Sequence, residues 1–124
     1  MKKAILFLLI CALLLALPAC KQPTPEEPAG YLIDRIPGEE YELTQANVET
    51  LEAALNDVTW TQGETKTACN YEFSWGDRKI QYSSLHGVVH DVLLERYCEL
   101  SEEQRNALNE MIEAFGLDIS QRYP

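Results

Sequence analysis

The apolar residues of this chain fall into stretches with three different spacings. Residues 45–57 and 102–115 repeat an apolar side chain every three or four positions, and residues 69–82 alternate apolar and polar side chains around a Gly-Asp pair. Residues 4–17, by contrast, are apolar without interruption. A repeat of three to four predicts an amphipathic helix, and alternation predicts a half-buried strand. The chain is therefore expected to form strands between two helices.

Residues 45–57 are preceded by the start signals of a helix. Thr44 is suited to the N-cap, because its hydroxyl can accept a hydrogen bond from a backbone N–H of the first turn. Leu43 and Val48 have the spacing of a hydrophobic staple. The expected buried stripe consists of Val48, Leu51, Leu55 and Val58.

Residues 102–115 form a second expected helix, with both of its ends marked. Ser101 and Gln104 match a capping box, and Glu102 and Glu103 lie in the first turn, where the helix dipole favours negative charge. Gly116 is suited to a left-handed stop after the last turn. The expected apolar stripe consists of Leu108, Met111, Ile112 and Phe115.

A β-hairpin is expected over residues 68–84. Successive side chains of a strand point to opposite faces, and Gly76-Asp77 supplies a two-residue turn. The expected apolar face comprises Cys69, Tyr71, Phe73, Trp75, Ile80 and Tyr82.

Residues 85–98 fit two interpretations. The β-branched side chains of Val88, Val89 and Val92 favour a strand, although the apolar positions also fit a helical spacing. One or two strands, bent after Gly87, are the preferred interpretation. The expected fold class is α+β, a small antiparallel sheet of about three strands with an N-terminal and a C-terminal helix packed on one face. It is expected to span residues 37–124 as a single domain.

Residues 1–19 are expected to be a signal peptide. Lys2 and Lys3 form a basic start, and the fourteen apolar residues that follow are too few to span a hydrocarbon core, which takes about twenty. Leu17-Pro18-Ala19-Cys20 resembles the lipobox of bacterial lipoproteins, although Pro18 departs from the usual Ala or Ser. The resemblance implies a diacylglyceryl group on the Cys20 thiol and cleavage before Cys20. The alternative is a secreted protein that begins with a free Cys20.

Residues 20–36 are expected to be a lipid-anchored tether rich in Pro and Glu. Its first part, KQPTPEEPAG, contains three prolines and no aliphatic side chain larger than alanine. Such a segment extends by about 3 Å per residue, so that roughly ten residues reach about 30 Å from a bilayer. The rest of the chain resembles small bacterial lipoproteins, a resemblance that implies no particular activity.

The charge of the chain restricts its partners. Removal of residues 1–19 removes Lys2 and Lys3 and no acid, so that 8 basic and 20 acidic residues remain, a net charge of −12. This balance argues against a nucleic-acid partner, whose phosphates require a basic surface. It also argues against close contact with anionic headgroups, and it would steer a cationic partner toward the protein.

Two cysteines remain in the body of the domain. Cys69 and Cys98 are an even pair in an exported chain, and a disulfide between them is expected. Reduced, buried thiols are the alternative.

Few residues suggest chemistry, and no cofactor is expected. His86 and His90 have the spacing of two metal ligands, with Asp91 or Glu95 as a third, but coincidence on a polar face is the favoured interpretation. A thiol enzyme would pair a cysteine with a histidine base, yet no signature of one surrounds either cysteine. Most aromatic residues are expected in the core, which leaves Trp60 as the candidate for a surface contact.

The favoured function is a non-enzymatic binding module of the bacterial cell envelope, anchored outside the cytoplasm through acyl chains on Cys20. Its partner would be a protein or another envelope component. Inhibition of a cationic protein such as lysozyme is one alternative. A weak metal carrier, or a metal- or thiol-dependent enzyme, built on His86, His90 and Cys98 is the other.

The lipobox predicts the mass of the native protein. Protein extracted from its own membrane should have the mass of residues 20–124 plus two or three acyl chains, because one chain alone anchors only marginally. Intact-mass spectrometry measures this directly. An unmodified chain that begins at another residue would contradict the prediction.

Overall fold

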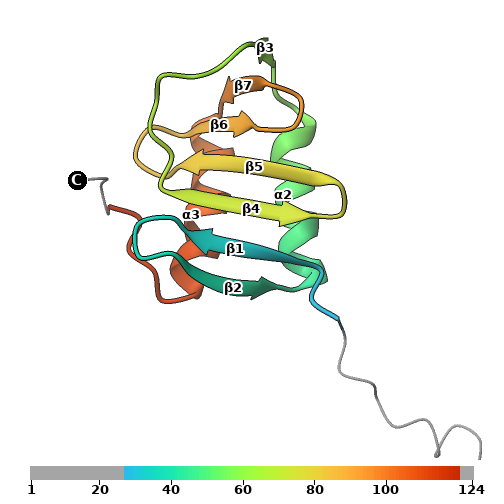
Figure 1. Cartoon of the computed structure of the whole chain (residues 1–124), viewed down its shortest axis with the longest axis vertical. Helices are drawn as coiled ribbons and strands as arrows, with labels where there is room; N and C mark the ends of the chain where they lie inside the picture. Colours follow the sequence, from blue (N-terminus) through green and yellow to red (C-terminus); the bar gives the residue numbers. More distant parts are fainter. Residues whose placement is uncertain (1–26, 121–124) are drawn as a thin grey trace, which may run out of the picture.

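The computed structural model describes residues 27–120, which form one seven-stranded antiparallel sheet and two helices (Figure 1). The strands lie in the order β2-β1-β4-β5-β6-β7-β3. The strands are β1 (Gly30–Asp34), β2 (Glu39–Leu43), β3 (Thr61–Gln62), β4 (Tyr71–Trp75), β5 (Arg78–Ser83), β6 (Val88–Asp91) and β7 (Arg96–Glu99). The helices are α2 (Gln45–Asn56) and α3 (Glu102–Ala114).

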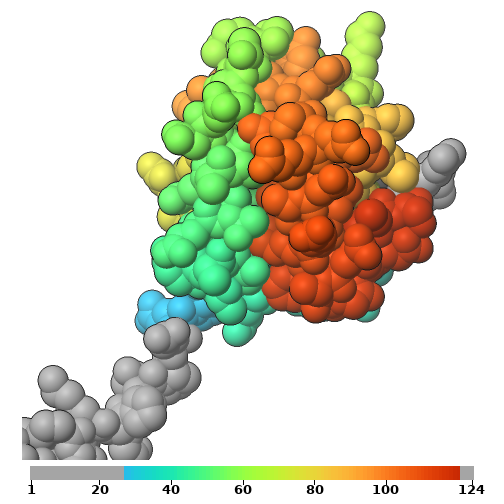
Figure 2. Space-filling view, turned by 180° about the vertical axis from the view of Figure 1, so that it is seen from behind, coloured from blue at the N-terminus to red at the C-terminus, as the bar shows by residue number. Residues whose placement is uncertain are grey.

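Both helices lie side by side on the same face of the sheet (Figures 1 and 2). Their apolar stripes meet the inward-facing side chains of the central strands, and α2 also receives a hydrogen bond from the Trp75 indole to the Glu52 carboxylate. The largest fully buried side chains include Tyr71, Tyr82, Phe73, Leu32, Leu51, Ile80, Leu108 and Ile112. The core thus occupies one side of the sheet.

The expectation of about three strands is wrong, since the sheet has seven. The missed strands carry weak signals: β1 has consecutive apolar residues, the alternation of β2 is limited to Tyr41 and Leu43 among three glutamates, and β3 has two residues. Glu is depleted in strands, and short apolar runs do not identify a strand by period. The pairing of β1 between β2 and β4 also means that the sheet begins within residues 20–36, the expected tether.

The expected local signals are present at both helices and at the hairpin. Thr44 caps α2, and Ser101 and Gln104 form the capping box of α3. A two-residue turn joins β4 to β5, and its first residue, Gly76, has a φ of +54°, as a type II′ turn requires. Residues 85–98 form the two strands of the preferred interpretation, with Gly87 at a φ of +65° just before β6.

A buried polar network joins α3 to the sheet at the end of β5. The Tyr82 hydroxyl donates to Asn109 Oδ1 at 2.6 Å, and Arg105 donates to the carbonyls of Ser84 and Leu85. The Asn70 amide donates to the Ser84 hydroxyl. Buried polar groups require such partners, so that this network determines how α3 sits on the sheet.

The N-terminal features expected from the sequence lie outside the described residues. These are the signal peptide, residues 1–19, and the lipid-bearing Cys20. Within residues 27–120, neither helix is long and apolar enough to cross a membrane.

The network around Tyr82 predicts a measurable loss of stability in Tyr82→Phe. The substitution leaves Asn109 Oδ1 buried without this donor, and the free energy of unfolding should fall by about 1–3 kcal/mol. Tyr31→Phe, at a side chain that is 37% exposed, is the matched control and should change it by less than about 0.5 kcal/mol. Urea denaturation measures both values, and equal effects of the two variants would contradict the role of the network.

Candidate functional site

The face of the sheet opposite the helices carries a polar row across its centre. Cross-strand neighbours in this row are Glu72, Gln81, His90 and Tyr97, from β4, β5, β6 and β7. Gln81 donates to the Glu72 carboxylate at 3.4 Å, and Lys79 lies 3.8 Å from the same carboxylate. Because the helices cover the other face, we refer to this side as the open face.

Residues 63–70 connect β3, at one edge of the sheet, to β4 near its centre, and pass the ends of the strands between them (Figure 1). Both ends of this loop are held. The Gly63 N–H donates to the Glu95 carbonyl at 2.8 Å, and Asn70 exchanges two hydrogen bonds with Ser84. The loop therefore has a defined position beside the open face.

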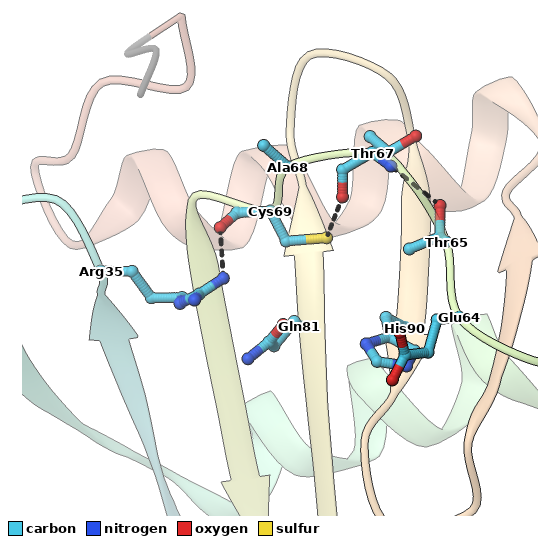
Figure 3. A pocket seen from close by; sticks show the side chains of 8 residues that line it. All are labelled: Arg35, Glu64, Thr65, Thr67, Ala68, Cys69, Gln81 and His90. Atoms are coloured by element: carbon cyan, nitrogen blue, oxygen red, sulfur yellow. Dashed lines mark hydrogen bonds between the residues drawn. The ribbon is translucent and has the colours of Figure 1, made fainter. Parts of the chain in front are cut away.

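A pocket of about 400 Å³ lies between this loop and the open face of β5 and β6 (Figure 3). Most of its lining side chains are polar, and Arg35 closes one side by donating to the Cys69 carbonyl at 2.7 Å. Inside the loop, the Thr67 N–H donates to the Thr65 hydroxyl. The lining residues are Arg35, Glu64, Thr65, Thr67, Ala68, Cys69, Gln81 and His90.

His90 is the residue of this pocket whose hydrogen bonding is incomplete. Its Nε2 atom is buried, and no residue in the described part of the chain provides a hydrogen-bond partner for it. Buried polar atoms nearly always have a partner, and the exceptions need an explanation. A ligand that reaches Nε2 from the pocket by displacing the side chains over it, and that donates to or accepts from this atom, would supply one.

The thiol of Cys69 lines the same pocket but is poorly suited to nucleophilic chemistry. Its Sγ donates to the Thr67 carbonyl at 3.7 Å, and the residue is 3% exposed. Burial raises the pKa of this thiol to about 11, against the weaker opposing effect of Arg35. The thiolate is the nucleophile, so that Cys69 is almost entirely in its unreactive form at neutral pH.

The expected disulfide between Cys69 and Cys98 is not formed in the structure, where both are free thiols. Cys69 lies two residues before β4, Cys98 lies on β7, and β5 and β6 separate these strands. Three strand spacings amount to about 14 Å, whereas bridged Cα atoms lie within about 7 Å. In addition, Cys69 borders the open-face pocket, whereas Cys98 belongs to the core beneath the helices. Burial raises the pKa of Cys98 to about 11 as well.

The structure separates the candidate metal ligands. His86 is exposed in the turn after β5, whereas His90 lies on β6 and faces the pocket. Asp91, the neighbour of His90, points to the other face and forms ion pairs with Arg78 and Arg96. Among residues 27–120, no three His, Cys, Asp or Glu side chains are grouped to hold a metal ion.

Trp60 is not the free aromatic platform that the sequence suggested. The Arg96 guanidinium lies 4.2 Å from its ring centroid, a cation–π contact, and the half-buried ring packs against the core. Among the other aromatic side chains, Tyr71, Trp75 and Tyr82 are buried, as expected, whereas Tyr97 is only partly buried.

The sequence pointed to one pocket residue as a ligand, His90, and did not indicate that Arg35, Glu64 and Gln81 line the same pocket. These residues come from the end of β1, the loop and β5, and nothing in their local spacing connects them. Only the alternation of β5 carried a signal, because it places Gln81 on the face opposite Ile80 and Tyr82. No family model, curated protein or solved structure matches the chain.

The burial of both thiols predicts slow alkylation without any need for a reductant. In a Cys20→Ser chain at pH 8, Cys69 and Cys98 should react with iodoacetamide at least about 100-fold more slowly than an ordinary thiol, since their pKa values are about 11 rather than 9.0. Both should react at once in denaturant. Mass spectrometry follows alkylation at the two sites. If alkylation required prior reduction, the two cysteines would be joined in a disulfide, and the prediction would be wrong.

Proposed function

We propose that this chain is a lipid-anchored, non-enzymatic binding module on the outer side of a bacterial membrane, and that its ligand binds on the open face, in the pocket beside residues 63–70. The observation that carries this proposal is the buried Nε2 of His90, which has no partner among the described residues. An imidazole nitrogen without a partner can form a hydrogen bond to a ligand, and no existing hydrogen bond of this nitrogen has to break first.

The surroundings of His90 support a polar ligand. Gln81 lies beside it across the strands, and the threonines of the loop contribute further donors and acceptors. Ligand sites place a few polar groups in a preformed concavity, and the loop next to this pocket is held at both ends. The raised pKa of Cys69 favours binding over covalent catalysis here.

The lipobox supports the location of this module. A chain anchored through Cys20 stays within reach of the envelope, so that a modest affinity for an envelope component is enhanced by a high effective concentration. A small domain with a polar pocket on its open face fits such a role.

A photo-cross-linker on the open face tests the proposal. p-Benzoyl-phenylalanine at Gln81 should give an adduct with an envelope component in living cells, whereas the same group at Asn106, on the exposed side of α3, should not. His90→Ala in the Gln81 variant should reduce the adduct about fivefold, the factor for one hydrogen bond of about 1 kcal/mol.

The amount of adduct formed by each variant is measured by mass spectrometry or blotting. Thermal unfolding of each variant shows whether the domain is still folded, since His90 is a strand residue. Equal adducts from Gln81 and Asn106, or an adduct that His90→Ala leaves unchanged, would contradict binding in this pocket.

A further inference from the structure

Two leucines at the turn between β6 and β7 are exposed to solvent. Leu93 is 60% exposed and Leu94 is 58% exposed, the highest values among the large hydrophobic side chains of the described residues. The turn is held in this position: the Leu94 N–H donates to Asp91 Oδ1 at 3.3 Å, and the Glu95 carbonyl accepts from Gly63. The two leucines are therefore presented outward by fixed backbone.

This turn lies at the end of the sheet where the chain enters β1. The pairing of Gly30 with Trp75 places the start of β1 beside the β4–β5 turn, and the pairing of Ile80 with Asp91 places the β6–β7 turn at the same end (Figure 1). Between β1 and β6 lie three strand spacings, about 14 Å. A surface that approaches the start of β1 along the strands also approaches Leu93 and Leu94.

The chain that precedes β1 limits the distance to an anchor. Nine peptide units connect Cys20 to Ala29, and nine residues span at most about 30 Å when fully extended. A lipid on Cys20 would keep this end of the sheet within that distance of the bilayer. This step depends on the anchor of the proposed function.

The β4–β5 and β6–β7 turns with their flanking residues are together neutral, although Glu27 and Glu42 lie beside the start of β1 at the same end. Residues 75–79 and 91–96 have no net charge, whereas the chain from Cys20 onward carries −12. The charged residues of these two segments are Asp77, Asp91 and Glu95, and Arg78, Lys79 and Arg96. Anionic headgroups repel acidic surfaces, so that these two turns can approach a bilayer at lower cost than the acidic remainder of the protein.

We propose that the anchored domain contacts its own bilayer through the β6–β7 turn, with Leu93 and Leu94 inserted between the lipid headgroups. Two side chains are a weak anchor alone, but the Cys20 lipid makes their insertion an intramolecular event. The strands then stand on the membrane, and the open-face pocket faces sideways, accessible to envelope components.

Tryptophan quenching in vesicles tests this contact. The chain from Cys20 onward is coupled through the Cys20 thiol to a maleimide lipid in phosphatidylcholine vesicles with brominated acyl chains, since Cys69 and Cys98 are buried. Leu94→Trp and Glu110→Trp each add one indole, the second on the exposed side of α3. Quenching by the bromines should lower the fluorescence of the indole introduced in Leu94→Trp at least twofold. The fluorescence of the indole introduced in Glu110→Trp should stay unchanged.

Absence of quenching at Leu94→Trp, or equal quenching at both positions, would overturn the proposal. A blue shift of the Leu94→Trp emission that grows with protein concentration in the absence of vesicles would also overturn it, because a second copy of the protein would then cover the turn. The anchor in this experiment is chemical, so that these failures concern the turn alone. A native protein without lipid on Cys20 would instead overturn the anchor of the proposed function.

Discussion

The hydrogen bonds of Ser84 connect the end of β5 to the loop of residues 63–70, to helix α3 and to the segment that follows α3. Its hydroxyl accepts from Asn70 and donates to the Ile119 carbonyl, its N–H donates to Asn70, and its own carbonyl accepts from Arg105 and Asn109. One residue at the end of β5 thus ties the loop on one side of the sheet to α3 on the other. Because these groups are buried, each loses a partner if any element moves.

This constraint accounts for the difference between the two faces. With α2 and α3 fixed over one face, the apolar side chains of the strands are covered there, and the alternate positions form the open face. The same bonds fix the end of the loop at Asn70, and the loop in turn forms one wall of the pocket around His90. The fold therefore places a preformed polar pocket on the side that the helices leave uncovered.

The elements with strong local signals could be predicted from the sequence. Both helices carry caps and an apolar stripe, and the β4–β5 hairpin carries alternation and a Gly turn. The acidic β2 and the short β3 form because the sheet supplies their partners, which no local pattern reveals. The pocket depends on strand order, which brings Arg35, the loop, Gln81 and His90 together, and the same order keeps Cys69 and Cys98 apart.

The claim that a ligand binds on the open face can be tested most directly by amide hydrogen exchange. Exchange is followed by mass spectrometry in the purified protein, with and without a detergent-solubilised fraction of its own envelope. Binding at the pocket predicts slower exchange in residues 63–70, while residues 102–114 of α3 keep their rates. Slowing confined to α3, or identical rates throughout the loop, would contradict the account.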